Sequence, residues 1–376
     1  MELPQYFADF LSGIRPTQAD KDDYQTGHKT LTKRLKDDDV LGDIIVSTFL
    51  QGSIRRATAV RTLNGTKADV DVVVVTKLSK DEYTPQQAMD IFKPFLNKWY
   101  ANKWKFNSRS MKIELSYVEM DLVVTSAPSE VEERILKSDS VTTDSNLEES
   151  LDWFLSSSWV DPTRRIFGRQ YPGFLEALKA AAWQSEPLYI PDRDAKIWEA
   201  THPLAQIEWT WRKNKNTNGH YVNVVKALKW WRKVNYPDVK YPKGYPLEHM
   251  IGDNCPDTVQ SVAEGITLSL EQIVSNYKLY VDCGLVPNLK DRGVPTHNVL
   301  QRLSFADFKA FYEAVCEAAK TARQALDEKD LVKSVEAWRK LFGNKFPPAP
   351  AVKSSDRGGF TERDKKTDDI TGGRFG

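Results

Sequence analysis

The feature that most constrains the fold is DVDVVVV at residues 69–75, a run of valines headed by two aspartates. Val is β-branched and favours strands, and an unbroken Val run predicts a strand that is buried on both faces of a sheet. Asp69 and Asp71 are two residues apart, so both side chains point to the same side of that strand. Carboxylates this close repel each other unless a cation neutralises them, and Mg²⁺ prefers oxygen ligands of this kind. The run therefore predicts a sheet with a metal-binding end.

Two further features favour a metal site over the alternative that Asp69 and Asp71 simply begin a strand at an exposed edge. Asp121 in VEMDLVVT also begins a Val/Leu strand. Three carboxylates from adjacent strands can hold two Mg²⁺ ions, which activate a hydroxyl and neutralise a leaving pyrophosphate. Gly52-Ser53 follows a predicted strand and precedes a predicted helix, so backbone N–H groups and a hydroxyl can face phosphate oxygens.

The chain divides by pattern into three parts. Residues 4–40 have helical periodicity, and another helix is predicted to begin at Thr84, a good cap that is followed by Pro. From about residue 150, long helical patterns follow with Trp-rich segments such as LDWFLSSSW (151–159) and no clear strand. Near the end, charged residues, Gly and Ser replace large apolar ones, which indicates flexibility. We expect a core lobe with N-terminal helices, a helical lobe and a flexible tail, over residues 1–160, 161–348 and 349–376.

The composition limits the functional classes. With 376 residues, 40% of them hydrophobic, the chain can bury a large core. A net charge of +1 gives no basic field for tight binding of a long nucleic acid, so no long template is expected. Cys255, Cys283 and Cys316 form no CxxC pair, which favours a reducing compartment over a disulfide framework. No stretch approaches the ~20 apolar residues that a membrane span needs, so we expect a cytoplasmic protein that does not bind membranes.

The segments QGSIRRATAV, DVDVVVV and MDLVVT together resemble the active-site signature of the polymerase-β-type nucleotidyltransferases. More narrowly, they resemble the cGAS/DncV-like nucleotidyltransferases (CD-NTases) of bacterial anti-phage (CBASS) signalling systems. The resemblance continues in VVKALKWWRK, in KGYPLEHMIGD and from GVPTHNVLQRL to AWRKLFGNKFP, where it is nearest to clade D. It implies an α+β fold: a polymerase-β-type core sheet with helices, a mainly helical second lobe, and an active site in the cleft between them.

The resemblance also implies roles for individual residues. The matching catalytic and metal-binding positions, for two Mg²⁺ ions that Mn²⁺ can replace, are Asp69, Asp71 and Asp121. The matching nucleotide-binding positions are Gln51, Gly52, Ser53, Lys229 and Tyr245. In the family, a Lys at the position of Lys229 contacts the triphosphate, and an aromatic residue at the position of Tyr245 stacks on a nucleobase. On the residues alone, Lys229 can equally be a surface side chain that snorkels, and Tyr245 an ordinary turn residue.

For activity, the resemblance implies template-independent joining of ATP, and possibly GTP, into a cyclic oligonucleotide, with clade D suggesting an adenine-rich trinucleotide. Such a product is a second messenger that reaches a downstream effector. Two alternatives stay open. A nucleotidyltransferase of the same fold can act on an RNA, protein or small-molecule acceptor, although a long RNA requires a basic track that is not evident. The second alternative is a non-catalytic scaffold that keeps the fold and has lost activity, and the presence of all three aspartates argues against it.

The last ten residues, TDDITGGRFG at 367–376, suggest a separate function. The polar segment from Ala351 can stay extended and reach into the cleft of another protein. Ile370 and Phe375 can anchor such binding, and the unhindered carboxylate of Gly376 suits adenylation. Some CD-NTases are joined through the C-terminus to target molecules by an operon-encoded fusion of ubiquitin-activating and ubiquitin-conjugating domains. The resemblance therefore implies C-terminal conjugation at Gly376; the alternative is a frayed end.

Overall fold

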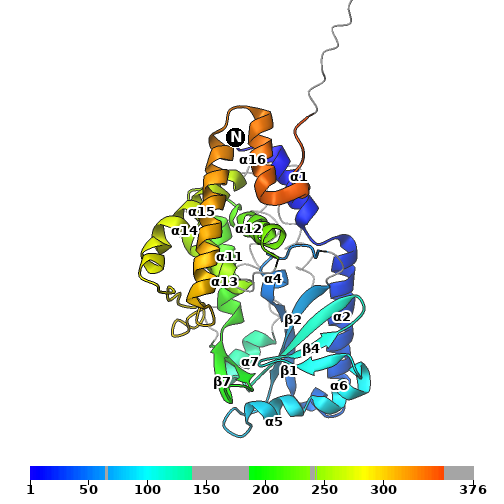
Figure 1. The fold of residues 1–376 in the computed structure, drawn as a ribbon. Helices are drawn as coiled ribbons and strands as arrows, with labels where there is room; N and C mark the ends of the chain where they lie inside the picture. Colours follow the sequence, from blue (N-terminus) through cyan, green and yellow to red (C-terminus); the bar gives the residue numbers. More distant parts are fainter. Residues whose placement is uncertain (64–66, 138–185, 238–241, 243, 351–376) are drawn as a thin grey trace, which may run out of the picture.

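The structure, a computed structural model, describes residues 1–63, 67–137, 186–237, 242 and 244–350. Figure 1 shows a sheet flanked by helices at one end of the molecule and a group of helices at the other, which is an α+β fold. In these ranges, no helix combines the length and the apolar character needed to cross a membrane. The helical pattern at 151–159 and the tail from residue 351 lie outside the described residues.

The main sheet has five strands in the order β1-β2-β5-β4-β3. Their bounds are Ile45–Gln51 (β1), Ala68–Thr76 (β2), Trp104–Phe106 (β3), Met111–Glu114 (β4) and Val118–Thr125 (β5). β2 and β5 run parallel, and the other neighbouring strands run antiparallel. The valines at 72–75 are 0% or 1% exposed, which confirms the prediction that this strand is buried on both faces.

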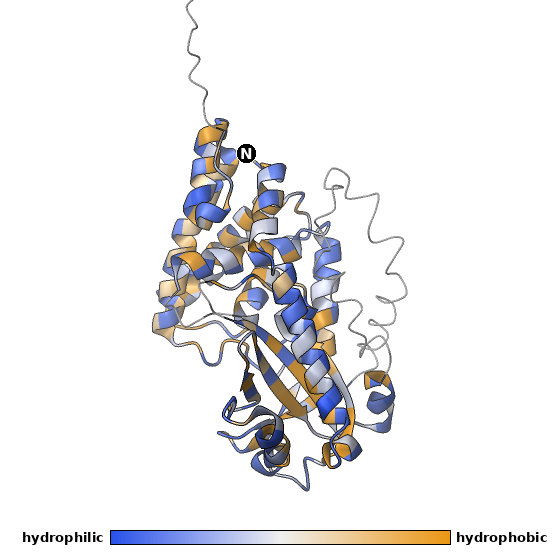
Figure 2. Cartoon of the chain, turned by 90° about the vertical axis from the view of Figure 1, so that its right-hand side faces the viewer, coloured by the Kyte–Doolittle hydropathy of each residue, from blue (hydrophilic) through white to orange (hydrophobic). Residues whose placement is uncertain are grey.

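Alternation along β2 divides its valines between two cores. Val70, Val72 and Val74 belong to the core on one face, together with side chains of the helices on that side. These helices are α2 (Gln18–Lys36), α5 (Pro85–Asp90) and α6 (Lys93–Tyr100). Val73 and Val75 belong to the core on the opposite face, which includes side chains of α7 (Glu130–Leu136) and α11 (Pro203–Asn216). Figure 2 shows hydrophobic colour along the strands and mixed colour on the covering helices.

The starts of the helices follow local capping chemistry. Thr84 caps α5 through a reciprocal capping box with Gln87, at the start that the sequence predicts. The helical pattern of residues 4–40 is interrupted at Pro16, so that α1 (Pro4–Ile14) and α2 are separate helices. Thr17 then caps α2 through a second capping box. Two one-turn helices, α3 (Leu41–Ile44) and α4 (Gly52–Arg55), flank β1.

The helical end of the molecule has its own core, which also includes α1. Its other helices are α12 (Tyr221–Asn235), α13 (Tyr245–Asn254), α14 (Val262–Asp282), α15 (Phe305–Asp327), α16 (Leu331–Phe342) and the 3₁₀ helix η1 (Gly343–Lys345). Phe7 of α1 lies edge-on to Trp338, with ring centroids 5.0 Å apart. Phe10 lies 4.6 Å from Phe342. α1 therefore packs with the end of the described chain, and the predicted lobe boundaries near residues 160 and 348 stay predictions.

The expectation of no strand after about residue 150 is wrong. β6 (Leu188–Asp192) and β7 (Ile197–Thr201) pair antiparallel as a hairpin. The pattern was missed because each strand has only five residues, and β6 contains Pro191. Long-range contact stabilises the hairpin: the Ser126 amide, just after β5, donates a hydrogen bond of 2.9 Å to the Tyr189 carbonyl.

We predict that Phe10→Ala destabilises the protein by about 3–5 kcal/mol, because it empties a fully buried site between α1 and α16. Urea denaturation measures the change. Val40→Ala is the control, because Val40 is 64% exposed and its truncation should change stability by less than about 0.5 kcal/mol. A loss below about 1 kcal/mol for Phe10→Ala would contradict the packing described for α1.

Candidate active site

The three aspartates lie on two adjacent strands and on the same face of the sheet. In the parallel pairing of β2 with β5, Asp71 is the register partner of Asp121, and Asp69 is the partner of Glu119. Side chains alternate along each strand, so all four carboxylates share the face to which Val73 also points. Sequence reasoning identified three of them and missed Glu119, which is one period-two step before Asp121 in VEMD.

The polar turn between β3 and β4 orients Asp121. Its Oδ1 accepts hydrogen bonds from Asn107 Nδ2 at 3.0 Å and from Ser110 Oγ at 2.8 Å. Arg109 in the same turn forms ion pairs with Asp192 of β6 at 2.8 Å and with Glu199 of β7 at 2.5 Å. The hairpin that the sequence analysis missed therefore holds the turn that orients an aspartate of the site. In the sequence, the only signal for this turn was the polar segment FNSRS between two strands.

The carboxylates of β2 are hard to ionise in the metal-free protein. Asp69 lines a cavity that is partly open to solvent. Burial of its carboxylate, then the charges of Asp71 and Asp121, raise the pKa of Asp69 to about 7. Burial and Asp121 raise the pKa of Asp71 to about 6, although nearby Arg56 and Lys229 favour its charged form. A divalent cation would remove this repulsion.

A lysine of β4 partly balances the acidic face. Lys112 is the register partner of Asp121, and its Nζ forms an ion pair of 2.6 Å with Glu119. The charge of Lys112 also favours the ionised form of Asp69. Glu119 is thus neutralised by the protein itself, whereas the pKa values of Asp69 and Asp71 remain raised.

Gly52 lies against Asp71 and cannot be replaced without strain. Gln51 is the register partner of Asp71, and Gly52 follows with φ of +73°. A Cβ atom at Gly52 would lie 1.8 Å from Asp71 Oδ2, so the glycine leaves the space that this carboxylate occupies. The helix predicted to follow is only one turn long, α4, and Ala57 just beyond it has a positive φ. The Gly-Ser turn and the aspartates therefore form one site.

Lys229 and Arg56 meet at a buried acid that sequence reasoning missed. Glu248 of α13 is 3% exposed. Its Oε1 accepts from Lys229 Nζ at 3.0 Å, and its Oε2 accepts from Arg56 Nε at 2.9 Å. Burial alone would raise the pKa of Glu248, but the charges of Arg56 and Lys229 outweigh it and lower the pKa to about 2. Glu248 is therefore charged at neutral pH.

Tyr245 is the first residue of α13 rather than part of a surface turn. It is half-buried, and its ring centroid lies 5.1 Å from the guanidinium carbon of Arg56. Tyr245 also lines the same cavity as Asp69. The aromatic ring and the aspartate thus border one space, as a base-stacking residue near a reacting centre requires.

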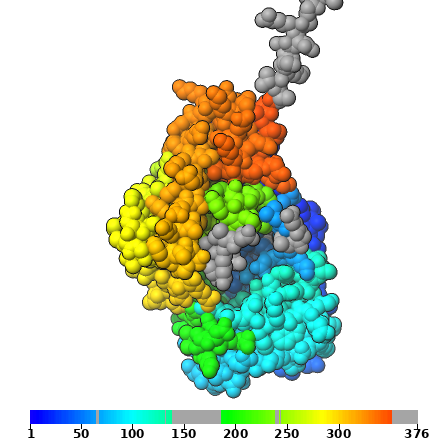
Figure 3. All heavy atoms as spheres, viewed as in Figure 1, coloured from blue at the N-terminus to red at the C-terminus, as the bar shows by residue number. Residues whose placement is uncertain are grey.

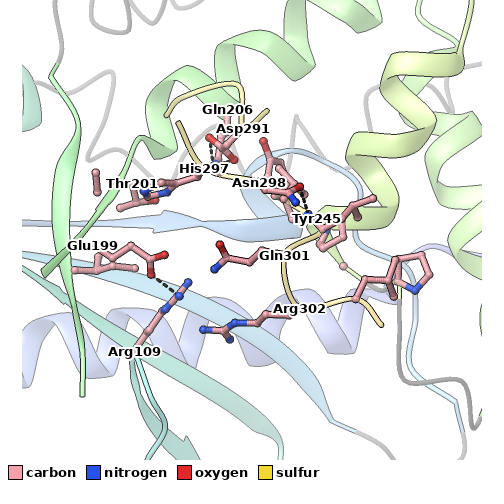
Figure 4. A pocket seen from close by; sticks show the side chains of 18 of the residues that line it. Arg109, Glu199, Thr201, Gln206, Tyr245, Asp291, His297, Asn298, Gln301 and Arg302 are labelled. Carbon is pink, nitrogen blue, oxygen red and sulfur yellow. Dashed lines mark hydrogen bonds and ion pairs between the residues drawn. The ribbon is translucent and has the colours of Figure 1, made fainter. Parts of the chain in front are cut away.

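The cavity has a volume of about 610 Å³ and lies where the helical end meets the sheet and the hairpin, a junction that Figure 3 shows between the yellow-to-orange and the green-to-blue segments. Its walls come from β7, α11, the start of α13 and the loop at 291–303. Figure 4 shows Gln301 and Arg302 between the Arg109–Glu199 pair and Tyr245. Ligand pockets typically have volumes of about 300–1,000 Å³, so the cavity can hold a nucleoside. The sequence analysis included residues 293–303 (GVPTHNVLQRL) in the family resemblance but assigned them no role in the site.

The donor chemistry of the site fits a divalent cation. Within the described residues, no group of three or more His, Cys, Asp and Glu side chains is placed to hold a metal ion as it stands. The aspartates nevertheless supply hard oxygen donors. Burial and neighbouring carboxylates raise the pKa values of Asp69 and Asp71, and a cation would offset this destabilisation of their charged forms. The space that Gly52 leaves at Asp71 supports the same fit.

We predict that Asp69→Asn raises the melting temperature of the metal-free protein, and that the rise is larger at pH 8 than at pH 5. The pKa of Asp69 in the folded protein exceeds its ordinary value of 3.8. Between these pKa values the folded state binds more protons than the unfolded state, so its stability falls as pH rises from about 4 to 7. Asn removes the charge and this penalty. Thermal unfolding in EDTA at both pH values measures it; an equal shift at pH 5 and pH 8 would contradict the cause.

Comparison with known proteins places the chain in a family. Residues 1–130 match the SMODS domain, the Second Messenger Oligonucleotide or Dinucleotide Synthetase domain. The "Probable cyclic AMP-AMP-GMP nucleotide synthase" of Salmonella paratyphi B is 47% identical over 382 residues, which cover 100% of both chains. The "Cyclic AMP-AMP-GMP synthase" of Enterobacter hormaechei subsp. hoffmannii (strain UCI 50) is 45% identical over 382 residues, again 100% of both chains.

A solved structure supports the same fold. The CD-NTase CdnG of Bradyrhizobium diazoefficiens, solved in complex with GTP, superposes with a TM-score of 0.61. The match covers 90% of this chain and 94% of that chain at 12% sequence identity. Full-length identity to curated relatives, a matching synthetase domain and this shared fold agree. The chain therefore belongs to the bacterial CD-NTases, the nucleotidyltransferases that make cyclic oligonucleotides in CBASS anti-phage systems.

Proposed function

We propose that the chain joins ATP and GTP into a cyclic trinucleotide with two AMP units and one GMP unit. The names of the two full-length relatives support these bases, and the clade D resemblance, which we also propose for this chain, supports an adenine-rich product. The observation that carries the chemistry is the register of β2 and β5, which sets Asp71 beside Asp121.

We also propose that Asp69, Asp71 and Asp121 hold two Mg²⁺ ions. The Gly52 turn and the raised pKa values of the β2 carboxylates support this role. When bound, the ions supply activation of the acceptor 3′-hydroxyl and neutralisation of the leaving pyrophosphate. Mn²⁺ can replace Mg²⁺ because it also accepts carboxylate oxygens.

The turn after β1 binds the donor triphosphate. Gln51, Gly52 and Ser53 stand next to Asp71, so the backbone N–H groups and the Ser53 hydroxyl can contact phosphate oxygens. Lys229 adds a positive charge from the helical end. Both sides of the cleft are therefore needed to bind one triphosphate.

Tyr245 and Asp121 act on the other parts of the substrates. The ring of Tyr245, on the wall of the cavity, stacks on a nucleobase. Asp121 is held through Oδ1 by Asn107 and Ser110, which leaves Oδ2 available near the reacting hydroxyl. Asp121 can therefore help to accept the proton of that hydroxyl.

We propose that the product acts as a second messenger for a downstream effector and that the enzyme works in the bacterial cytoplasm, where ATP and GTP are available. Transfer to an RNA, protein or small-molecule acceptor is the competing function. The two differ in a simple way: a self-contained synthase forms phosphatase-resistant product from ribonucleotides and Mg²⁺ alone.

We predict that the wild-type chain forms the cyclic trinucleotide of two AMP units and one GMP unit from ATP, GTP and Mg²⁺. The double variant Asp69→Asn with Asp71→Asn should lower the rate of product formation by at least ~10³-fold, which corresponds to about 4 kcal/mol of activation barrier. The substitutions remove the charge that binds the metal and keep the side-chain shape. Mass spectrometry identifies the product. Product without GMP would overturn the base assignment, and a variant rate near that of wild type would overturn the metal site.

We further propose that an operon-encoded fusion of ubiquitin-activating and ubiquitin-conjugating domains joins Gly376 to target molecules. The proposal rests on the sequence of the tail, because Gly376, Ile370 and Phe375 lie outside the described residues. It requires that Gly376 carry the terminal carboxylate, which the intact mass of the protein checks first.

We predict that Gly376→Glu leaves nucleotide synthesis unchanged and abolishes conjugation in the presence of that fusion enzyme. The larger, charged side chain hinders adenylation of the terminal carboxylate, and none of the residues proposed to bind metal or nucleotide belongs to the tail. Gel shift and peptide mass spectrometry detect the conjugate. Equal conjugation of the variant and the wild-type chain would contradict the proposal.

A further inference from the structure

We infer that Glu248 is a positioning residue for the donor triphosphate: its two carboxylate oxygens hold Lys229 and Arg56 where they bind phosphate oxygens. This inference rests on the proposed function, because it assumes that the cleft binds a nucleoside triphosphate. It adds a residue that the sequence analysis did not single out and an interaction that joins both sides of the cleft.

The geometry of the carboxylate carries the inference. Lys229 comes from α12 and approaches Oε1 at 3.0 Å, whereas Arg56 comes from the segment after Gly52-Ser53 and approaches Oε2 at 2.9 Å. Each oxygen is therefore assigned to one cation, and the two cations belong to opposite sides of the cleft. A single buried side chain, 3% exposed, fixes their relative position.

The two cations also act electrostatically on the reacting centre. The charges of both Arg56 and Lys229 act on the carboxylate of Asp71. The Lys229 side chain is 13% exposed and that of Arg56 is 7% exposed. Lys229 is therefore nearly buried, and it retains N–H donors beyond the one that Glu248 accepts.

Glu248 also connects these cations to the base-stacking residue. Tyr245 lies three residues earlier on α13, one helical turn away and on the same side of the helix. The guanidinium of Arg56 lies over the Tyr245 ring at 5.1 Å. Arg56 thus contacts the carboxylate and the ring together, so the position of the triphosphate is tied to that of the base.

Charge balance explains why a carboxylate is needed here. Two buried cations without an anion repel each other and lose hydration, which favours their withdrawal into solvent. Glu248 neutralises them in the empty cleft and keeps their side chains ordered. An arriving triphosphate then meets donors that are already in place, which reduces the entropy cost of binding.

The test uses the full-length chain and a non-hydrolysable ATP analogue with Mg²⁺. Glu248→Gln keeps the size of the side chain and removes its charge. We expect it to weaken analogue binding by roughly tenfold to a hundredfold, the effect of a disturbed charge-assisted contact. Adenosine, which lacks phosphates, should lose less than about threefold, because Tyr245 remains. Isothermal titration calorimetry measures the affinity for the ATP analogue, and competition of adenosine with the analogue measures the affinity for adenosine.

Glu132→Gln is the matched control. Glu132 of α7 is also buried, at 2% exposed, and accepts a hydrogen bond from the Glu186 amide rather than from Lys229 or Arg56. Its substitution should leave analogue binding within about twofold of wild type. A double-mutant cycle with Lys229→Met tests whether Glu248 acts through Lys229. If it does, Glu248→Gln should reduce analogue affinity by a smaller factor when Lys229 is already absent.

Several outcomes would overturn the inference. Equal losses for the analogue and for adenosine would show that Glu248 acts only through the fold. Strict additivity with Lys229→Met, or unchanged analogue binding, would exclude positioning of Lys229. If Glu248→Gln does not fold, Glu248→Asp replaces it; that variant keeps the charge, moves it by one methylene, and must also lose analogue affinity selectively.

The same experiments separate this inference from the proposed function. A wild-type chain that binds the analogue but makes no cyclic product would overturn the function, while a selective loss in Glu248→Gln would still support the positioning role. A wild-type chain that does not bind the analogue would overturn both.

Discussion

The parallel pairing of β2 with β5 is the constraint on which the site depends. It sets Asp71 beside Asp121, so that carboxylates distant in sequence become neighbours. A slip of one residue would turn one set of aspartates to the opposite face. The apolar core on that opposite face opposes such a slip, because the displaced carboxylates would be buried in it. The run DVDVVVV therefore stabilises the sheet and aligns its acidic end.

Other charged residues surround the acidic end of the sheet and balance it. Lys112 neutralises Glu119 within the sheet, whereas the helical end supplies Lys229 and the buried Glu248. The hairpin of β6 and β7 contributes by pairing with Arg109, in the turn that orients Asp121. Acidic groups of the sheet and basic groups around the cleft are thus arranged before any substrate binds.

Local sequence patterns predicted the parts of this arrangement that depend on local chemistry. The Val run, the cap at Thr84 and the turn at Gly52-Ser53 all follow from the preferences of neighbouring residues. The hairpin was missed because its short strands are stabilised by contact with the core sheet. Glu248 was missed for a similar reason: one acidic residue in a helix has no distinctive pattern, and its role depends on Arg56, 192 positions away. The packing of α1 on α16 is also a long-range contact.

The most direct test of the account is crystallography of the wild-type chain with Mn²⁺ and a non-hydrolysable ATP analogue, using the anomalous signal of Mn²⁺. The account predicts two Mn²⁺ peaks at the aspartates, one bound by Asp69 and Asp71 and the other by these two and Asp121. The triphosphate should contact Gly52, Ser53 and Lys229. Mn²⁺ peaks away from the aspartates, or a triphosphate bound elsewhere in the cleft, would contradict the central claim that the β2–β5 register builds the catalytic centre.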